Sequence, residues 1–425
     1  MVVGDLRETG GWTAHELTRA QADVLAASEL ADVRPLPGST NVWEVCARDA
    51  IGAAMLTAGN VRIDLRVAPK IEVRRLLFLL GYAASPKTWR ADWVDLPVVA
   101  GLPVAVGEAL TRLADRALRA GLLQGYLNVE DAGMTVRGRV RHVEHMRRHF
   151  GQPLPVEVTF DEYTVDVAEN RILKAALMRM LRVPGMPALT RRRLLIGVHR
   201  LAEVTDLVPG APVPRWTPSR LNARYGPALR MAELVLSGTS CDLARGSLQA
   251  SGFMLSMSKL FEDFVTVALG EDLVARRGGR VKTQDSRWSL DEAGAVALRP
   301  DLVWYPIVAP RSRFGRHAGA DADPPGIVVD AKYKAEKRNS FPNADVYQLL
   351  AYCTSLGLSR GHLVYAKGNE EGARYRIPGA GPHGSGVTVD AHTLDLDSEP
   401  EALLGQIALL AQRIAGTTHR LRVSP

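Results

Sequence analysis

The alternation of apolar and polar positions predicts a mixture of strands and helices in the first half of the chain. Residues 61–67 alternate between apolar and charged side chains, and this period of two is typical of a half-buried strand. An apolar helix is predicted directly after it, over residues 73–83. Helical spacing predicts further helices over residues 13–27, 106–120, 169–181, 191–206 and 227–237, and residues 155–160 alternate as a second strand. We therefore expect a mixed α+β region.

Residues 238–251 separate this region from a second one with a different order of elements. A helix is predicted over residues 254–270, followed by two apolar strands over residues 296–304 and 327–333. The remaining predicted elements are a helix over residues 345–356, strands over 361–366 and 387–396, and a helix over 401–414. Strands and helices that alternate in this way indicate an α/β domain, within a protein that is α+β overall. We expect a mixed sheet flanked by helices.

Length and composition fit two globular domains. A chain of 425 residues exceeds one ordinary core, so we place the domains at residues 1–245 and 246–425. The net charge of +7 favours a polyanionic partner. The 3 cysteines lie far apart, which argues against a disulfide framework and a structural zinc site. No apolar run is long enough to cross a membrane and the first residues are unlike a signal peptide, so we expect a cytoplasmic protein.

Three acidic residues stand out because each lies in an apolar element. Asp301 and Asp330 lie in the two strands predicted around them, and Glu262 lies at the edge of the apolar stripe of the preceding helix. Lys332 follows Asp330 by two positions, so both side chains project from one face of a strand. Ionised carboxylates in apolar surroundings need a partner, and a cation is one.

These residues have the chemistry of a metal site for phosphodiester hydrolysis. A divalent metal makes water nucleophilic and neutralises developing negative charge. Mg²⁺ prefers one or two carboxylates together with waters and phosphate oxygens, and Mn²⁺ is the alternative metal. We expect its ligands to be Asp301, Asp330, the carbonyl oxygen of Ala331 and, directly or through water, Glu262. Lys332 would hold the attacking water or stabilise the developing charge.

The helix predicted over residues 345–356 adds a polar pair. Gln348 and Tyr352 are four residues apart and share one helical face, so we expect them to contact the scissile strand or to position Lys332. An aspartate followed by Asp-x-Lys also occurs as a surface salt bridge. The ordered set of helix-Glu, strand-Pro-Asp, strand-Asp-x-Lys and helix-Gln-x-x-x-Tyr favours a nuclease.

The most basic part of the first half is the segment of residues 121–149. Within it, Arg137, Arg139 and Arg141 are our candidates for contact with a partner protein or with phosphate. The alternative is a solvated arginine face without a partner.

The ordered set resembles the PD-(D/E)xK nuclease superfamily, in its branch with a QxxxY helix. More narrowly, the chain resembles the McrC family, the nuclease subunits of McrBC-type modification-dependent restriction systems. Four motifs carry this resemblance in the second half: Leu260-Phe261-Glu262, Arg299-Pro300-Asp301-Leu302-Val303, Asp330-Ala331-Lys332-Tyr333-Lys334 and Asp345-Val346-Tyr347-Gln348. Four upstream motifs make it specific to McrC: Ala68-Pro69-Lys70-Ile71, Gly138-Arg139-Val140, Asp161-Glu162-Tyr163 and Asn170-Arg171-Ile172-Leu173-Lys174.

The resemblance implies a Mg²⁺-dependent DNA endonuclease that a motor protein activates. In this family the partner, McrB, is a hexameric AAA+ ring that hydrolyses GTP and carries the DNA-reading domain. The N-terminal half of McrC inserts into the ring and stimulates hydrolysis. The implied partners are therefore a McrB-like AAA+ GTPase and double-stranded DNA with modified bases. The chain agrees in one respect, since it has no GxxxxGK[ST] loop and so is not itself a P-loop NTPase.

Two alternatives share the same motifs. The first is a stand-alone RecB-like DNA repair exonuclease, which needs no partner. The second is a non-catalytic adaptor with a decayed site, against which the intact set of Glu262, Asp301, Asp330, Lys332 and Gln348 argues. The target base and the choice between GTP and ATP stay open.

Overall fold

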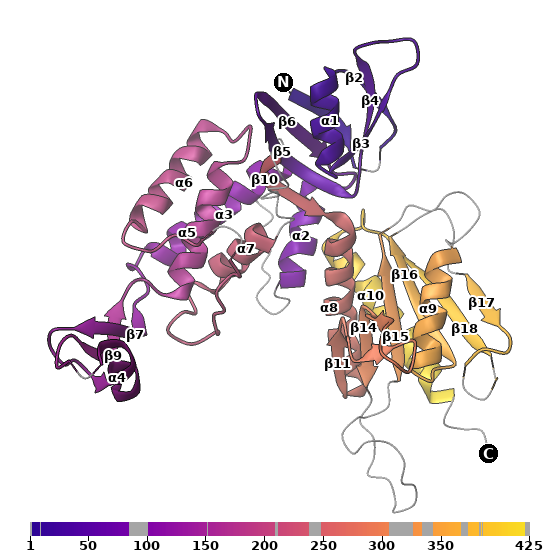
Figure 1. The fold of residues 1–425 in the computed structure, drawn as a ribbon. Helices are drawn as coiled ribbons and strands as arrows, with labels where there is room; N and C mark the ends of the chain where they lie inside the picture. Colours follow the sequence, from indigo (N-terminus) through magenta and orange to yellow (C-terminus); the bar gives the residue numbers. More distant parts are fainter. Residues whose placement is uncertain are drawn as a thin grey trace, which may run out of the picture. The chain divides into compact units, whose positions relative to one another are not determined.

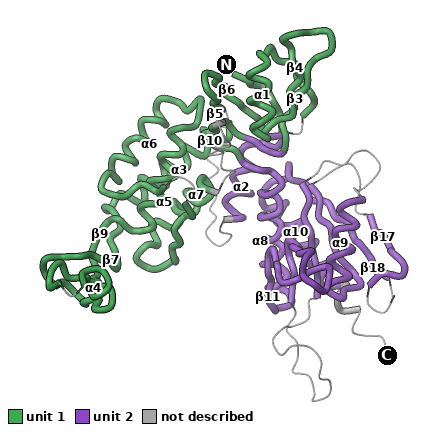
Figure 2. Tube along the Cα trace, in the orientation of Figure 1, with its two compact units in different colours: residues 1–48, 52–68, 99–254 green, residues 49–51, 69–98, 255–425 purple. Residues whose placement is uncertain are grey.

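The computed structural model describes residues 2–8, 10–84, 101–150, 152–208, 211–237, 248–305, 326–333, 343–366, 373–381, 384 and 386–420. The chain divides into two compact units, drawn in green and purple in Figure 2. Unit 1 comprises residues 1–48, 52–68 and 99–254, and unit 2 comprises residues 49–51, 69–98 and 255–425. The boundary predicted between residues 245 and 246 falls among residues outside the described ones.

Unit 1 opens with two small sheets. In the first, the strand order is β2 (Thr13–Glu16), β4 (Val42–Ala47) and β3 (Ala31–Pro35). In the second, the order is β1 (Val2–Arg7), β6 (Val61–Ala68), β5 (Ala50–Ala58) and β10 (Leu248–Ser256). Strand β6 confirms the strand predicted over residues 61–67, and its apolar positions Ile63, Leu65 and Val67 are buried.

The helix predicted over residues 13–27 is wrong in its first part. Residues 13–16 form β2, and helix α1 (Arg19–Ala27) begins only after Thr18. Thr18 caps this helix, because its side chain accepts from the amide of Gln21 while its own amide donates to the Gln21 side chain at 2.9 Å. This capping box fixes the helix start three residues after the strand ends.

Four helices form the centre of unit 1. They are α3 (Leu102–Leu118), α5 (Ala168–Leu181), α6 (Ala188–Arg200) and α7 (Gly226–Ser237). All four were predicted, although α6 ends at Arg200 rather than at residue 206. Their apolar stripes bury residues such as Leu110, Leu177 and Leu194 against one another.

A separate small sheet lies at one end of unit 1, beyond these helices (Figure 1). It consists of β7 (Gly125–Gly133), β9 (Val156–Thr164) and β8 (Arg139–Val140), all antiparallel, with helix α4 (His142–His149) packed on β9. We call residues 125–164 the tip. More than half of the residues of β7 and of α4 are exposed, and no residue of α4 is buried, so the tip buries little apolar surface of its own.

Unit 2 is built on a six-stranded mixed sheet. The strand order is β11 (Arg280–Thr283), β14 (Leu302–Tyr305), β15 (Ile327–Lys332), β16 (Arg360–Ala366), β18 (Val387–Leu394) and β17 (Arg374–Ile377). Strands β15, β16 and β18 are parallel, and the pairings outside them are antiparallel. The central strands are buried along almost their whole length, as parallel strands covered on both faces usually are.

Helices cover this sheet. Helix α9 (Asn343–Ser355) packs on β15 and β16, where Leu349 and Cys353 share a buried cluster with Val328 and Leu363. Helix α8 (Met257–Arg277) contacts β14 and β15 and also packs against α10 (Pro400–Arg420) and α2 (Val73–Ala84). The predicted α/β arrangement, a mixed sheet flanked by helices, is confirmed.

Two predicted boundaries in unit 2 are wrong. Met254 belongs to β10, and α8 begins at Met257 because the Ser256 side chain caps it by accepting from the amide of Lys259. The strand predicted over residues 296–304 is interrupted: β13 (Ala297–Leu298) pairs with β12 (Trp288–Ser289), and β14 starts at Leu302. Pro300 lies in the interruption, since proline cannot donate to a sheet ladder.

No helix in the described part of the chain is long and apolar enough to cross a membrane.

Candidate active site

Two buried carboxylates meet at the start of β14. Asp301 lies directly before this strand, and Asp330 lies on its antiparallel neighbour β15, where Leu302 pairs with Val329. The side chains are 7% and 1% exposed, respectively. Oδ2 of Asp301 accepts a hydrogen bond of 2.7 Å from the backbone amide of Ala331. The fold therefore brings together two acids that are 29 positions apart in the sequence.

Lys332 forms an ion pair with the second of these acids. Its Nζ lies 2.7 Å from Oδ2 of Asp330, and its side chain is 19% exposed. Both residues lie on the face of β15 that also carries Val328, as the spacing predicts. The ion pair is largely buried, so water screens its charges only weakly.

The electrostatics of the site disfavour two ionised aspartates side by side. Burial, followed by the charge of Asp330, raises the pKa of Asp301 to about 9. Burial also raises the pKa of Asp330, although the charge of Lys332 opposes it. Burial alone would lower the pKa of Lys332, but the carboxylates of Asp330, Asp301 and Asp345 together raise it. A further positive charge at the site would allow both aspartates to ionise.

The donor atoms suit a hard divalent cation. Both carboxylate oxygens of Asp330 are buried; Oδ2 faces the Lys332 ammonium, and Oδ1 has no hydrogen-bond partner among the described residues. Mg²⁺ uses one or two carboxylates and takes its other ligands from water and phosphate. Asp301 and Asp330 supply two. The described residues contain no group of three or more His, Cys, Asp or Glu arranged around one metal position.

Glu262 lies in the same unit, on α8, and is half-buried. Its Oε1 accepts a hydrogen bond of 2.7 Å from Nε2 of Gln284, and its charge contributes to the raised pKa of Asp301. Glu262 is therefore near enough to act on Asp301 electrostatically. One carboxylate oxygen of Glu262 is therefore used by Gln284.

Gln348 and Tyr352 are joined to each other and to the backbone before Asp301. Nε2 of Gln348 donates to the Tyr352 hydroxyl at 2.7 Å, and this hydroxyl donates to the carbonyl of Arg299 at 3.2 Å. Tyr352 is only 3% exposed, whereas Gln348 is exposed. Tyr352 therefore lies on the buried side of α9, with Leu349 and Cys353.

One buried acid was missed as a site residue. Asp345 lies in the first turn of α9, is 2% exposed and accepts a hydrogen bond of 3.1 Å from the Tyr365 hydroxyl. Its charge raises the pKa of both Asp330 and Lys332. Acidic residues are common in the first turn of any helix, so the sequence offered no signal that this one points inward.

The three predicted arginines lie on the tip. Arg137 and Arg139 are exposed, and Arg141 pairs with Glu130 at 2.6 Å and with Glu144 at 3.7 Å. Lys334, the last residue of the Asp330-Ala331-Lys332-Tyr333-Lys334 motif, lies outside the described residues.

The comparison with protein families decides the identity. The family described as "McrBC 5-methylcytosine restriction system component" matches residues 46–366, which is more than half of the chain. The chain belongs to the McrBC family. The match includes every predicted site residue and the whole tip. The resemblance to the McrC family that the motifs indicated is thereby confirmed.

One solved structure supports the fold of this McrBC-family chain. One is a chain of a half-complex from the tetradecameric assembly of Thermococcus gammatolerans McrB AAA+ hexamers with bound McrC. It is 17% identical, with 93% of this chain and 88% of that chain covered and a TM-score of 0.53. A chain of the Thermococcus gammatolerans McrBC complex is 18% identical over 63% of this chain and 87% of that chain, with a TM-score of 0.37. Curated proteins gave no significant match.

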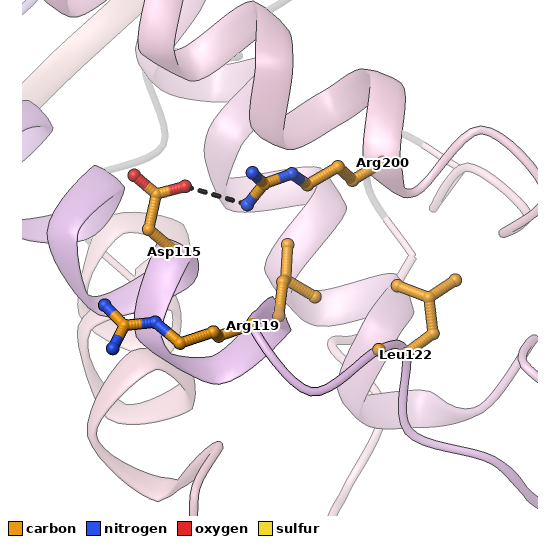
Figure 3. A pocket seen from close by; sticks show the side chains of 6 residues that line it. Asp115, Arg119, Leu122 and Arg200 are labelled. Atoms are coloured by element: carbon orange, nitrogen blue, oxygen red, sulfur yellow. Dashed lines mark hydrogen bonds and ion pairs between the residues drawn. The ribbon is translucent and has the colours of Figure 1, made fainter.

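The McrBC-family chain also has a polar pocket in unit 1, with a volume of about 630 Å³ (Figure 3). Nη1 of Arg200 lies 3.0 Å from Oδ1 of Asp115 across it. The lining residues are Asp115, Leu118, Arg119, Gly121, Leu122 and Arg200. Only one of them is acidic, so this pocket does not offer the paired carboxylates of the candidate site.

Proposed function

We propose that the protein is the Mg²⁺-dependent DNA endonuclease subunit of a McrBC-type restriction complex. The observation that carries this proposal is the pair of buried acids, Asp301 and Asp330, with Lys332 at 2.7 Å, in a chain of the McrBC family. A buried pair of acids with raised pKa values destabilises the folded protein, so such a pair indicates a functional role. The role that we propose for the pair is to bind a divalent cation that acts on a phosphodiester.

The residues would share the reaction as follows. Asp301 and Asp330 would hold the cation, with the carbonyl of Ala331 and a water on Glu262 as further ligands. When bound, the cation supplies Lewis-acid activation of the phosphodiester and lowers the pKa of an attacking water. Lys332 would orient that water and stabilise the charge that develops on phosphate. Tyr352 would hold the backbone before Asp301 in place through the carbonyl of Arg299.

We propose further that a McrB-like AAA+ ring activates the nuclease. The Thermococcus gammatolerans structure named above contains McrB AAA+ hexamers with bound McrC. A McrBC-family chain with a similar fold is expected to bind a ring of the same kind, and in turn to stimulate its GTP hydrolysis. Double-stranded DNA with modified cytosines is the expected substrate, since the family is described as a component of a 5-methylcytosine restriction system.

The tip is the surface that best suits such a ring. Phe150 is 90% exposed, and Tyr126, at 75%, stacks near Tyr163 with ring centroids 5.1 Å apart. The tip exposes five further large apolar side chains, Met134, Val136, Val143, Met146 and Leu154. Apolar surface of this extent, next to the exposed Arg137 and Arg139, is typical of a protein interaction site. Arginine and aromatic residues are also the ones enriched where binding energy concentrates.

The decisive experiment is reconstitution. The full chain would be purified with a McrB-like AAA+ partner and incubated with methylated or unmethylated linear and circular DNA, with Mg²⁺ or EDTA, and with GTP or ATP. We expect internal cleavage of methylated DNA that needs the ring, the nucleotide and Mg²⁺. Degradation from DNA ends without the ring would support the stand-alone exonuclease instead. Ring binding without any cleavage would support the adaptor.

A further inference from the structure

Asp345 is a further carboxylate near Lys332, besides those of Asp330 and Asp301. Strands β15 and β16 are parallel, and Lys332 is the register partner of Tyr365. The Tyr365 hydroxyl donates to Oδ2 of Asp345 at 3.1 Å, and Asp345 is 2% exposed. Lys332, Tyr365 and Asp345 therefore lie together under the first turn of α9, on the sheet face that also carries Asp330.

Register and hydrogen bonding place Asp345 beside Lys332, since Tyr365 is the neighbour of Lys332 on β16 and donates to Asp345. In agreement with this geometry, the charge of Asp345 raises the pKa of Asp330 and that of Lys332. A buried carboxylate in this position stabilises positive charge on whichever cation lies beside it.

The ion pair conflicts with metal binding at the same acid. Nζ of Lys332 lies 2.7 Å from Oδ2 of Asp330, one of the two oxygens that a divalent cation would use. An ammonium and a divalent cation repel each other at such separations, so Lys332 has to move when a cation binds. A buried ammonium that loses its counter-ion is strongly destabilised unless another carboxylate replaces it. The flexible stem of lysine allows such a move.

We propose that Lys332 has two positions: it pairs with Asp330 when no metal is bound, and with Asp345 when a divalent cation occupies Asp330. Tyr365 holds the Asp345 carboxylate for this second position. Asp345 is then a positioning residue that keeps Lys332 charged and beside the attacking water. This inference rests on the proposed nuclease function.

The test is calorimetric titration of the full chain with Mg²⁺, and with Mn²⁺ as a second probe, in four forms: wild type, Asp345→Asn, Lys332→Met and the double variant. If Asp345 receives Lys332, Asp345→Asn weakens metal affinity about tenfold in the wild type and no more than about twofold in the Lys332→Met background. Lys332→Met alone strengthens affinity, because it removes the competing cation. If Asp345 attracts the metal only through its charge, Asp345→Asn weakens metal affinity in the Lys332→Met background as much as in the wild type, or more. That result overturns the proposal.

A milder variant covers the case in which Asp345→Asn does not fold. Tyr365→Phe removes only the hydroxyl, and we expect it to weaken metal affinity about threefold, again only when Lys332 is present. An equal effect with and without Lys332 contradicts the proposal. In the reconstituted complex, Asp345→Asn is expected to lower kcat for cleavage at least tenfold with the KM for DNA unchanged, as loss of a positioning residue does.

Asp330→Asn distinguishes this inference from the function on which it rests. One possible result is that the wild type binds metal, that Asp330→Asn abolishes this binding, and that the effects of Asp345→Asn and Lys332→Met on metal affinity are additive. In that case only the two positions of Lys332 are wrong. If the wild type binds no divalent cation and the complex does not cleave, the proposed function itself fails.

Discussion

The backbone amide of Ala331 donates a 2.7 Å hydrogen bond to the carboxylate of Asp301. This bond connects the residue before β14 to the residue between Asp330 and Lys332 on β15. The two halves of the proposed metal site are therefore held together by the backbone of the sheet. A fixed distance between two acids is what a metal site needs before the metal arrives.

Replacement of either acid should abolish cleavage without loss of the fold. We expect Asp301→Asn and Asp330→Asn to lower the cleavage rate of the ring-bound complex by at least about 100-fold, because each removes a proposed metal ligand. Binding of the ring, measured by co-purification, should be unchanged. The matched control is Asp263→Asn on α8, next to Glu262, whose carboxylate pairs with Lys259 instead. Full activity of the Asp330→Asn protein would falsify the site.

The Tyr352 hydroxyl should contribute to stability and to cleavage, whereas that of Tyr347 on the same helix should not. Tyr352→Phe removes the donor to the carbonyl of Arg299 and the acceptor of Gln348. We expect a loss of about 1–2 kcal/mol in unfolding free energy and a cleavage rate several-fold lower. Tyr347→Phe, on the same helix but 66% exposed, should change neither quantity. Denaturant unfolding and the cleavage assay measure the two effects, and equal behaviour of both variants would refute the tethering role.

A close approach of α9 to β16 depends on Gly361. A Cβ atom at this position would lie 2.6 Å from Sγ of Cys353 and 2.9 Å from Cγ of Leu349, and both side chains are fully buried. We expect Gly361→Ala to destabilise unit 2 by about 1–3 kcal/mol, because the packed helix has to move. Gly405→Ala on α10 is the control, since its Cβ would contact nothing within 4 Å. That substitution should stabilise the helix by about 0.5–1 kcal/mol.

The stability of unit 2 should fall in mild acid because of a buried histidine pair. Nδ1 of His362 on β16 lies 3.2 Å from Nε2 of His392 on β18. Burial, with the charge of His392, lowers the pKa of His362 to about 3, and burial lowers that of His392 to about 4, from the ordinary value of 6.5. The unfolded chain therefore binds more protons than the folded one below pH 6.5, so stability is complete above that pH and is lost as the pH falls toward 4.

Thermal unfolding between pH 7.5 and about 4.5 measures this effect. We expect the unfolding temperature of the wild type to fall across this window, and that of His392→Leu to fall less, since one of the two protonation sites is gone. Replacement of the exposed His199 by Gln should leave the pH dependence as it is in the wild type. A wild-type unfolding temperature that does not change between pH 6.5 and 4.5 would show that the pair is not buried and neutral as described.

The tip should control ring binding independently of the nuclease site. We expect the double variant Phe150→Ala/Tyr126→Ala to weaken binding of a McrB-like ring about 10- to 100-fold, since exposed aromatic residues are frequent hot spots. The fold should be unaffected because both side chains are exposed. Leu195→Ala, 53% exposed on α6, is the control. Arg137→Ala tests the predicted arginine contact in the same titration. Unchanged ring affinity would support the alternative, in which Arg137 belongs to a solvated arginine face.

Local patterns predicted the elements whose burial follows a simple period. Strand β6 alternates because one of its faces is buried, and β15 is a continuous apolar run because it is covered on both faces. Helix α2 follows Lys70 as expected. Strands β10 and β11 were not predicted, since their residues look like a helix start and a basic loop until their partner strands are known. Pro300 was visible in the sequence, yet only the pairing of β13 with β12 shows that the strand is broken there.

The sequence by itself determined which residues are candidates for the site: Asp301, Asp330, Lys332, Glu262, Gln348 and Tyr352 are recognisable by type, spacing and order, and the upstream motifs point to the McrC family. Only the tertiary structure decided how these groups meet. It joined Asp301 to the amide of Ala331, placed Tyr352 under the backbone of Arg299, and turned Asp345 inward beside Lys332. The physical reason is that spacing along the chain fixes the face of a single helix or strand, whereas register and packing between elements fix distances across them.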